Sequence, residues 1–200
     1  MAGIVLDYGP LAAVLAAAGF AMAAALAPPA GRAAAGLYRL CGAVGAGFLV
    51  LIGLLILLEI GSRAAAVYVP GLKAYAGYSM AASAFFAFAY TFGHRAHIRM
   101  SAIVGRLAGR ARRIAEIWCL AASSFVTGFV CWYAVKLVAV SWDLEDVSEG
   151  TDRMLLWIPQ TAVAVGATVL FVCVLHRFVD VLRGADIGDQ RSADVMATAE

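Results

Sequence analysis

Charged residues are scarce in this sequence. Asp, Glu, Lys and Arg make up 14% of the 200 residues, and the formal net charge is +2. A soluble domain carries about a quarter charged residues and about half apolar ones, whereas 64% of this chain is hydrophobic and its mean hydropathy is +0.88. A water-soluble fold could not bury that excess, so we predict that the chain lies in a lipid bilayer and binds no nucleic acid.

Paired cysteines and catalytic motifs are also missing. Cys41, Cys119, Cys131 and Cys173 each fall inside an apolar run without CxxC spacing, which favours small packing residues over a disulfide or zinc framework. The sequence has no phosphate-binding glycine loop and no HExxH motif. No carboxylate lies in the middle of an apolar run, where a proton or sodium relay is expected. We predict neither an enzyme nor a bound cofactor or metal.

Long apolar runs are what the sequence has instead. Spanning the roughly 30 Å hydrocarbon core takes about 20 apolar residues in a helix, and backbone groups in lipid must pair within their own segment. We therefore predict an all-α membrane protein with four transmembrane helices, over Leu37–Ile60, Tyr75–Phe92, Ala115–Val140 and Leu155–Leu175.

A further apolar run, Leu11–Leu26, is short and mostly alanine. Because alanine gains little on transfer into lipid, this Ala-rich N-terminal helix could span the bilayer, lie on its surface or pack on a partner. The stretch Pro28–Gly31 predicts a break after it. We divide the chain into an N-terminal extension (1–36, apolar helix and Pro/Gly linker), a four-helix transmembrane domain (37–184) and a flexible cytoplasmic tail (185–200).

Basic residues are distributed unequally between the two sides of the predicted bundle. Eleven of the fifteen Lys and Arg residues lie before or at the start of the first span, between the second and third, or after the fourth. The opposite side holds the acidic loop Trp142–Thr151. Because cytoplasmic loops carry an excess of Lys and Arg, we predict that the middle loop and the C-terminus lie in the cytoplasm.

The predicted middle loop has a helical pattern of its own. Apolar residues recur on one face, and the other face is formed largely by Arg99, Arg106, Arg110 and Arg113. This pattern predicts a short amphipathic helix on the cytoplasmic side, lying against anionic lipid. A solvated connecting loop is the alternative.

Three histidines provide the one alternative function. His94 and His97 follow the second predicted span, and His176 ends the fourth on the same side. Two histidines at equal depth on facing helices can hold a haem. A four-helix haem-binding electron carrier is therefore the alternative hypothesis, although a histidine beside an arginine at the water edge is commonly a solvated side chain.

Short motifs then occur in a characteristic order. They are the runs Ala76–Ala82 and Phe85–Phe92, the run Arg95–Met100 with His97 and Arg99, Ser141 after the third span, and Trp157-Ile158-Pro159-Gln160 at the start of the fourth. This set resembles the small membrane subunit (DctQ-type) of tripartite ATP-independent periplasmic (TRAP) transporters, over about residues 37–184. The resemblance implies a four-span scaffold that braces a large permease subunit.

The resemblance also implies a location, partners and a role. The chain would lie in the bacterial inner membrane, within an ion-gradient-driven secondary transporter, such as a sodium symporter, that imports a small organic solute such as an organic acid. Its partners would be the large multi-span permease subunit and, directly or through the complex, a periplasmic solute-binding protein. Candidate interface or membrane-anchoring residues are His97, Arg99, Arg106, Arg110, Arg113, Trp157, Pro159 and Gln160.

Overall fold

The computed structural model describes residues 2–26, 28–93, 109–148 and 153–183. In these ranges the chain forms helices α1 (Ala2–Leu26), α2 (Pro28–Ala64), α3 (Leu72–Gly93), α5 (Gly109–Asp143) and α6 (Trp157–Leu182). An isolated antiparallel bridge joins Val147 to Leu155 in the connection between α5 and α6. The all-α class predicted from the apolar runs is confirmed.

Three of the described helices are long and apolar enough to cross a membrane. These candidate spans are Gly36–Ala64, Arg110–Asp143 and Trp157–Leu182, which correspond to the first, third and fourth predicted spans. Helix α3 covers the second predicted span with 22 residues, but its tyrosines, serines and glycines lower its hydropathy. A crossing by α3 therefore stays a prediction, as does the total of four.

Helices α2 and α5 are among those that begin earlier than the apolar runs indicate. The break expected around the prolines is short: α1 ends at Leu26 and α2 begins at Pro28. Proline is well tolerated in the first turn of a helix, where its missing N–H would have no intrahelical partner. Similarly, residues 109–114, predicted as part of an amphipathic segment, are continuous with α5.

Helix α6 lies at the centre of the molecule and contacts α1, α3 and α5. In its most apolar window 44% of residues are buried, against 11% in α2 and 11% in α5. One face of α6 contributes Val169 and Cys173 to a cluster with α2 and α3. The opposite face contributes Phe171 and Val172 to a second cluster with α1 and α5.

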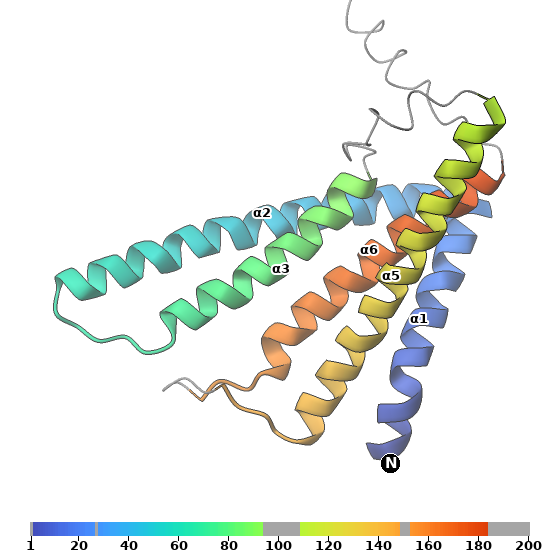
Figure 1. Cartoon of the computed structure of the whole chain (residues 1–200). Helices are drawn as coiled ribbons and strands as arrows, with labels where there is room; N and C mark the ends of the chain where they lie inside the picture. The colour runs from blue at the N-terminus through green and yellow to red at the C-terminus, as the bar shows by residue number, and fades with distance from the viewer. Residues whose placement is uncertain (1, 27, 94–108, 149–152, 184–200) are drawn as a thin grey trace, which may run out of the picture.

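Figure 1 shows how this arrangement shapes the molecule. The hairpin of α2 and α3 leans away from the group formed by α1, α5 and α6. The turn between α2 and α3 and the connection between α5 and α6 lie at one end of the helices, which we call the connection end. The start of α5 and the end of α6 lie at the other, which we call the arginine end.

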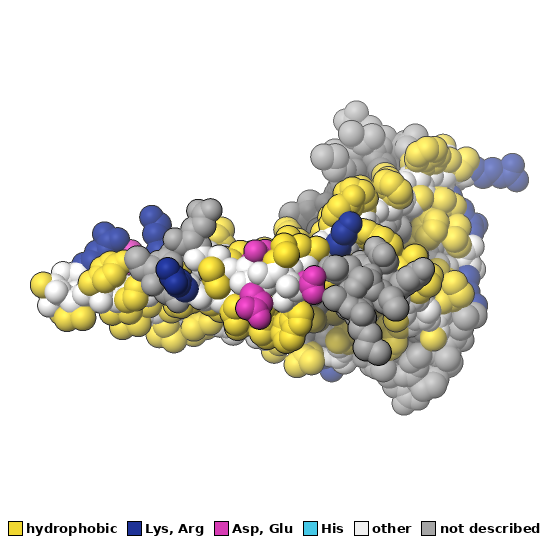
Figure 2. Space-filling view, turned by 90° about the horizontal axis from the view of Figure 1, so that it is seen from below, with side chains coloured by type: hydrophobic (Ala, Val, Ile, Leu, Met, Phe, Trp, Pro, Cys, Tyr) yellow, Lys and Arg dark blue, Asp and Glu magenta, His cyan; other side chains and the backbone are white. Residues whose placement is uncertain are grey.

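The connection end is seen face-on in Figure 2. The narrow arm of the hairpin extends from a broader body, and acidic side chains gather near the middle of this face. Between α5 and α6 the exposed carboxylates are Asp143, Glu145 and Asp146. Hydrophobic side chains cover much of the flanks, as expected for a surface in contact with lipid or with another membrane subunit.

Candidate functional site

Glycines set the closest approaches between helices. A Cβ added at Gly166 of α6 would lie 2.8 Å from the Cβ of Phe85 on α3. Gly45 of α2 packs against the backbone of Ala87, and the Ser83 hydroxyl donates a hydrogen bond to the Gly45 carbonyl oxygen over 3.0 Å. Small residues let membrane helices approach this closely.

The glycines of α2 fall into two groups. Gly42 and Gly45 face α3, where a Cβ at Gly42 would meet the ring of Tyr90. Gly47 and Gly53 have no heavy atom near such a Cβ. The sequence pattern identifies the helix that packs closely but not which of its glycines make the contact.

A buried polar group joins the hairpin to α6 near the arginine end. The Tyr38 hydroxyl lies 3.0 Å from Nδ1 of His176, and Tyr38 is 6% exposed. Nε2 of the same imidazole lies 3.9 Å from an Asp180 carboxylate oxygen. One helical turn along α6, the Cys173 thiol donates to the Ala89 carbonyl oxygen over 3.4 Å.

In the haem hypothesis His176 would be the ligand supplied by α6. Its Nδ1 lies within hydrogen-bond distance of the Tyr38 hydroxyl, while Nε2 lies 3.9 Å from the Asp180 carboxylate, beyond hydrogen-bond distance. His94 and His97 lie outside the described residues. Within the described part of the chain, no group of three or more His, Cys, Asp or Glu side chains could hold a metal ion.

Two residues of the predicted arginine face, Arg110 and Arg113, lie at the start of α5. Both are exposed. Arg112 pairs with the buried Glu116 one turn later in the helix, with Nε 3.5 Å from Oε1. Arg112 and Glu116, four residues apart, thus form an ion pair within α5. The other candidates of this face, Arg99 and Arg106, lie outside the described residues.

At the connection end, aromatic and polar side chains hold the start of α6. The rings of Trp142 and Trp157 meet edge to face, with centroids 4.5 Å apart. The Tyr78 hydroxyl of α3 lies 3.3 Å from that of Ser148. These contacts tie the α5–α6 connection to both neighbouring helices.

The other two candidates at this end, Pro159 and Gln160, lie in the first turn of α6. The backbone N–H of Gln160 donates to the Leu156 carbonyl oxygen over 3.3 Å. Its side-chain Oε1 is buried and accepts no hydrogen bond within the described structure. Trp157, Pro159 and Gln160 thus share one end of one helix, whereas Arg110 and Arg113 lie at the opposite end of the molecule.

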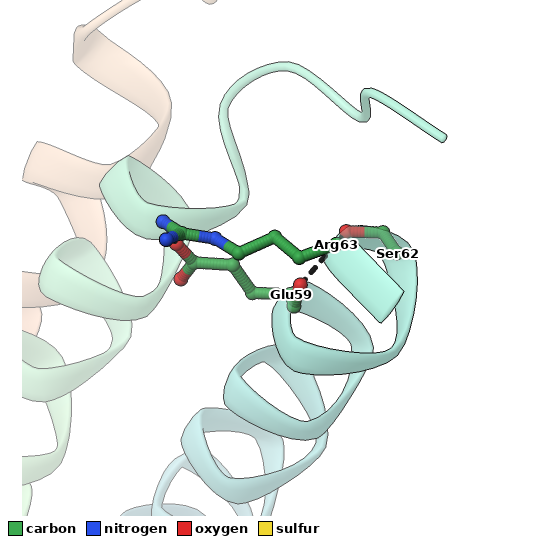
Figure 3. A network of polar contacts seen from close by, with 3 residues as sticks. All are labelled: Glu59, Ser62 and Arg63. Atoms are coloured by element: carbon green, nitrogen blue, oxygen red, sulfur yellow. Dashed lines mark hydrogen bonds and ion pairs between the residues drawn. The ribbon is translucent and has the colours of Figure 1, made fainter. Parts of the chain in front are cut away.

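An ion pair between Glu59 and Arg63 lies at the surface, at the end of α2. Nη2 of Arg63 lies 2.6 Å from Oε1 of Glu59, and the Ser62 hydroxyl donates to the Glu59 carbonyl oxygen over 2.9 Å. Figure 3 shows the Arg63 and Glu59 side chains running alongside each other at the helix end. The Arg63 side chain is 76% exposed, so water screens much of this interaction.

Replacing Arg63 with alanine should therefore change stability little. Exposed ion pairs contribute about 0.2–1 kcal/mol, and we expect a loss within that range. Thermal unfolding in detergent, compared with Glu59→Gln, is the measurement. A loss of unfolding free energy several times larger, in either variant, would mean that the ion pair contributes more than an exposed pair at a helix end.

Taken together, these features define a helical membrane protein in whose described residues the polar groups link one helix to another. The model of one protein family, the DctQ component of tripartite ATP-independent periplasmic transporters, matches residues 52–184. The chain belongs to this family, and it is a small membrane subunit of a TRAP transporter rather than an enzyme. Comparisons with curated proteins and with solved structures give no match.

Proposed function

We propose that this chain is the static scaffold that braces the large permease subunit of a TRAP transporter in the bacterial inner membrane. The transporter imports a small organic solute, of which an organic acid is the best candidate, using an ion gradient. A periplasmic binding protein delivers that solute. The C-terminus of the chain lies in the cytoplasm.

The distribution of charge carries this proposal. No Asp, Glu, Lys or Arg occurs in 40–58, 74–93, 117–135 or 154–176, so charged groups lie toward the ends of the four long helices. An ion or substrate path through a bundle needs ionisable groups within the membrane. A subunit without them depends on a partner for transport, and its own contribution is mechanical.

The exposed apolar surface supports a partner in the membrane. Large side chains point outward along α2 and α5, among them Leu49, Leu57, Trp118 and Phe125, each at least 65% exposed. In the assembled transporter, lipid and the large subunit together would cover these faces. The long hairpin of α2 and α3 offers a broad, thin surface for such contacts (Figure 1).

Four crossings fit the dimensions of the helices. At 1.5 Å per residue, the 22 residues of α3 extend about 33 Å, enough for a hydrocarbon core of roughly 30 Å. Exposed Arg110 and Arg113 support an arginine end in the inner headgroup layer, and the tryptophan pair supports a connection end at the outer one. We propose the same anchoring role for His97, Arg99 and Arg106.

Reconstitution tests the scaffold role. Cells that express the large permease and the binding protein should take up substrate only when this chain is also expressed, and a tag on this chain should co-purify the permease in mild detergent. Loss of uptake should therefore be nearly complete in its absence. Purification of this chain alone, together with unchanged uptake after its deletion, would refute the proposal.

A further inference from the structure

The N-terminal helix α1 packs against the middle of two candidate spans rather than against their ends. Ala17 and Ala21 are 5% and 0% exposed, and they cluster with Cys131 of α5 and with Phe171 and Val172 of α6. These partners lie near the midpoints of Gly109–Asp143 and Trp157–Leu182. A helix lying on the membrane surface would meet helix ends instead, so α1 lies at the depth of the hydrocarbon core.

The two faces of α1 differ in side-chain size. The inner face holds Pro10, Val14, Ala17, Ala18 and Ala21, of which Pro10, Ala17 and Ala21 are buried. The outer face presents larger apolar side chains: Leu11, Leu15, Phe20 and Met22, each between 38% and 61% exposed. Small residues allow close packing on protein, and large apolar residues supply the favourable contact with lipid that alanine lacks.

The length and composition of α1 suit a complete crossing. Its 25 residues extend about 37 Å, more than the roughly 30 Å that the core requires. Asp7 is its one charged residue, in the second turn. The alanines that left this helix ambiguous in the sequence include those that pack on α5 and α6.

The direction of α1 follows from its link to α2. The N-terminus lies at the connection end, and α1 runs from there toward the arginine end (Figure 1). Helix α2 starts two residues after α1 ends, and its Tyr38 meets His176 near the arginine end. The two ends of α1 are therefore at opposite ends of the bundle.

We propose that α1 is a fifth transmembrane helix, with its N-terminus in the periplasm, and that it occupies the face formed by α5 and α6. The absolute orientation rests on the proposed function, which places the arginine end in the cytoplasm. The large subunit then docks on other surfaces of this chain, because α1 already covers the face formed by α5 and α6.

Tag accessibility tests the crossing. The full chain, co-expressed with its large subunit, carries one uncharged epitope tag at each terminus, since added basic residues could themselves alter topology. In intact spheroplasts, protease should remove the N-terminal tag, and it should reach the C-terminal tag only after permeabilisation. Protection or removal of both tags together would place the termini on one side and overturn the proposal.

This outcome is separate from that of the scaffold role. With α2, α3, α5 and α6 each crossing once as proposed, termini on opposite sides mean that α1 crosses as well, whether or not the permease co-purifies. Conversely, a complex that forms with both termini on one side refutes the fifth helix and leaves the scaffold role intact.

A matched pair of leucine substitutions tests the packing. Ala21→Leu inserts a large side chain where Ala21 is 0% exposed, and Ala16→Leu adds the same atoms on an exposed position of the same helix. We expect Ala21→Leu to lower the melting temperature of the detergent-solubilised chain by at least about 2–4 °C, and Ala16→Leu to leave it unchanged. Equal melting temperatures for the two variants would show that α1 does not pack on α5 and α6.

Discussion

Replacing Gly166 with leucine is expected to separate α3 from α6 and to lower sharply the yield of folded protein. Even a methyl group at this position would lie 2.8 Å from the Cβ of Phe85 and 3.5 Å from backbone atoms of Phe85 and Phe86. A Cβ cannot rotate away, so the helices themselves must move. Extra methylenes in a packed core cost about 1–3 kcal/mol, and leucine should reach at least the upper part of that range.

The matched control is Gly53→Leu on α2. Gly53 also lies inside a long apolar helix, but a Cβ there has open space around it. Replacing an interior glycine should even favour the helix by up to about 1 kcal/mol, because glycine is the less favourable residue there by roughly that amount. Monodispersity and thermal unfolding in detergent measure both variants, and equal behaviour would mean that α3 and α6 are not packed as described.

The long apolar helices were predictable because the bilayer imposes a minimum length on any span. Runs such as Leu37–Ile60 and Leu155–Leu175 overlap α2 and α6, because about 20 consecutive apolar residues are typical of a helix that spans the bilayer. Helix ends were less predictable. Pro28 indicates a break, but a proline at a helix start is equally compatible with a new helix, and here it begins α2.

Contacts between distant segments left little signal in the sequence. Tyr38 and His176 are separated by 138 positions, and neither periodicity nor composition pairs them. Gly166 was not singled out, because one glycine among alanines and valines resembles ordinary packing. The sequence left the arrangement of α1 undecided for a related reason. Its alanines are weakly hydrophobic, and only the structure shows that they pack against Cys131 and Phe171.

The local ion pairs were the part of the candidate site that the sequence predicts most directly. Glu59 with Arg63 and Glu116 with Arg112 follow from the four-residue spacing of a helix surface. The membrane-anchoring roles of Trp157, Pro159 and Gln160 stay predictions, because the contacts that would test them involve lipid or another subunit.

Replacing Tyr38 with alanine is expected to loosen the hairpin of α2 and α3 from α6. The ring is 6% exposed, and its neighbours in the cluster include Cys41, Phe86 and Cys173. Truncating a buried aromatic side chain to alanine costs about 3–5 kcal/mol, so much of this chain should aggregate when extracted in detergent. Losing the hydroxyl also leaves Nδ1 of His176 without its partner.

Tyr38→Phe separates the two contributions. It keeps the ring in the cluster and removes the hydrogen bond, at an expected cost of about 0.5–1.5 kcal/mol. Tyr133→Ala, on a tyrosine that is 53% exposed on α5, is the control for loss of an aromatic ring at the membrane surface. Thermal unfolding in one detergent should rank the free energies of unfolding as Tyr38→Ala lowest and Tyr38→Phe well above it. If Tyr38→Ala instead matched Tyr133→Ala, the hairpin would be held to α6 by the glycine contacts farther along the helices, and not by this buried tyrosine.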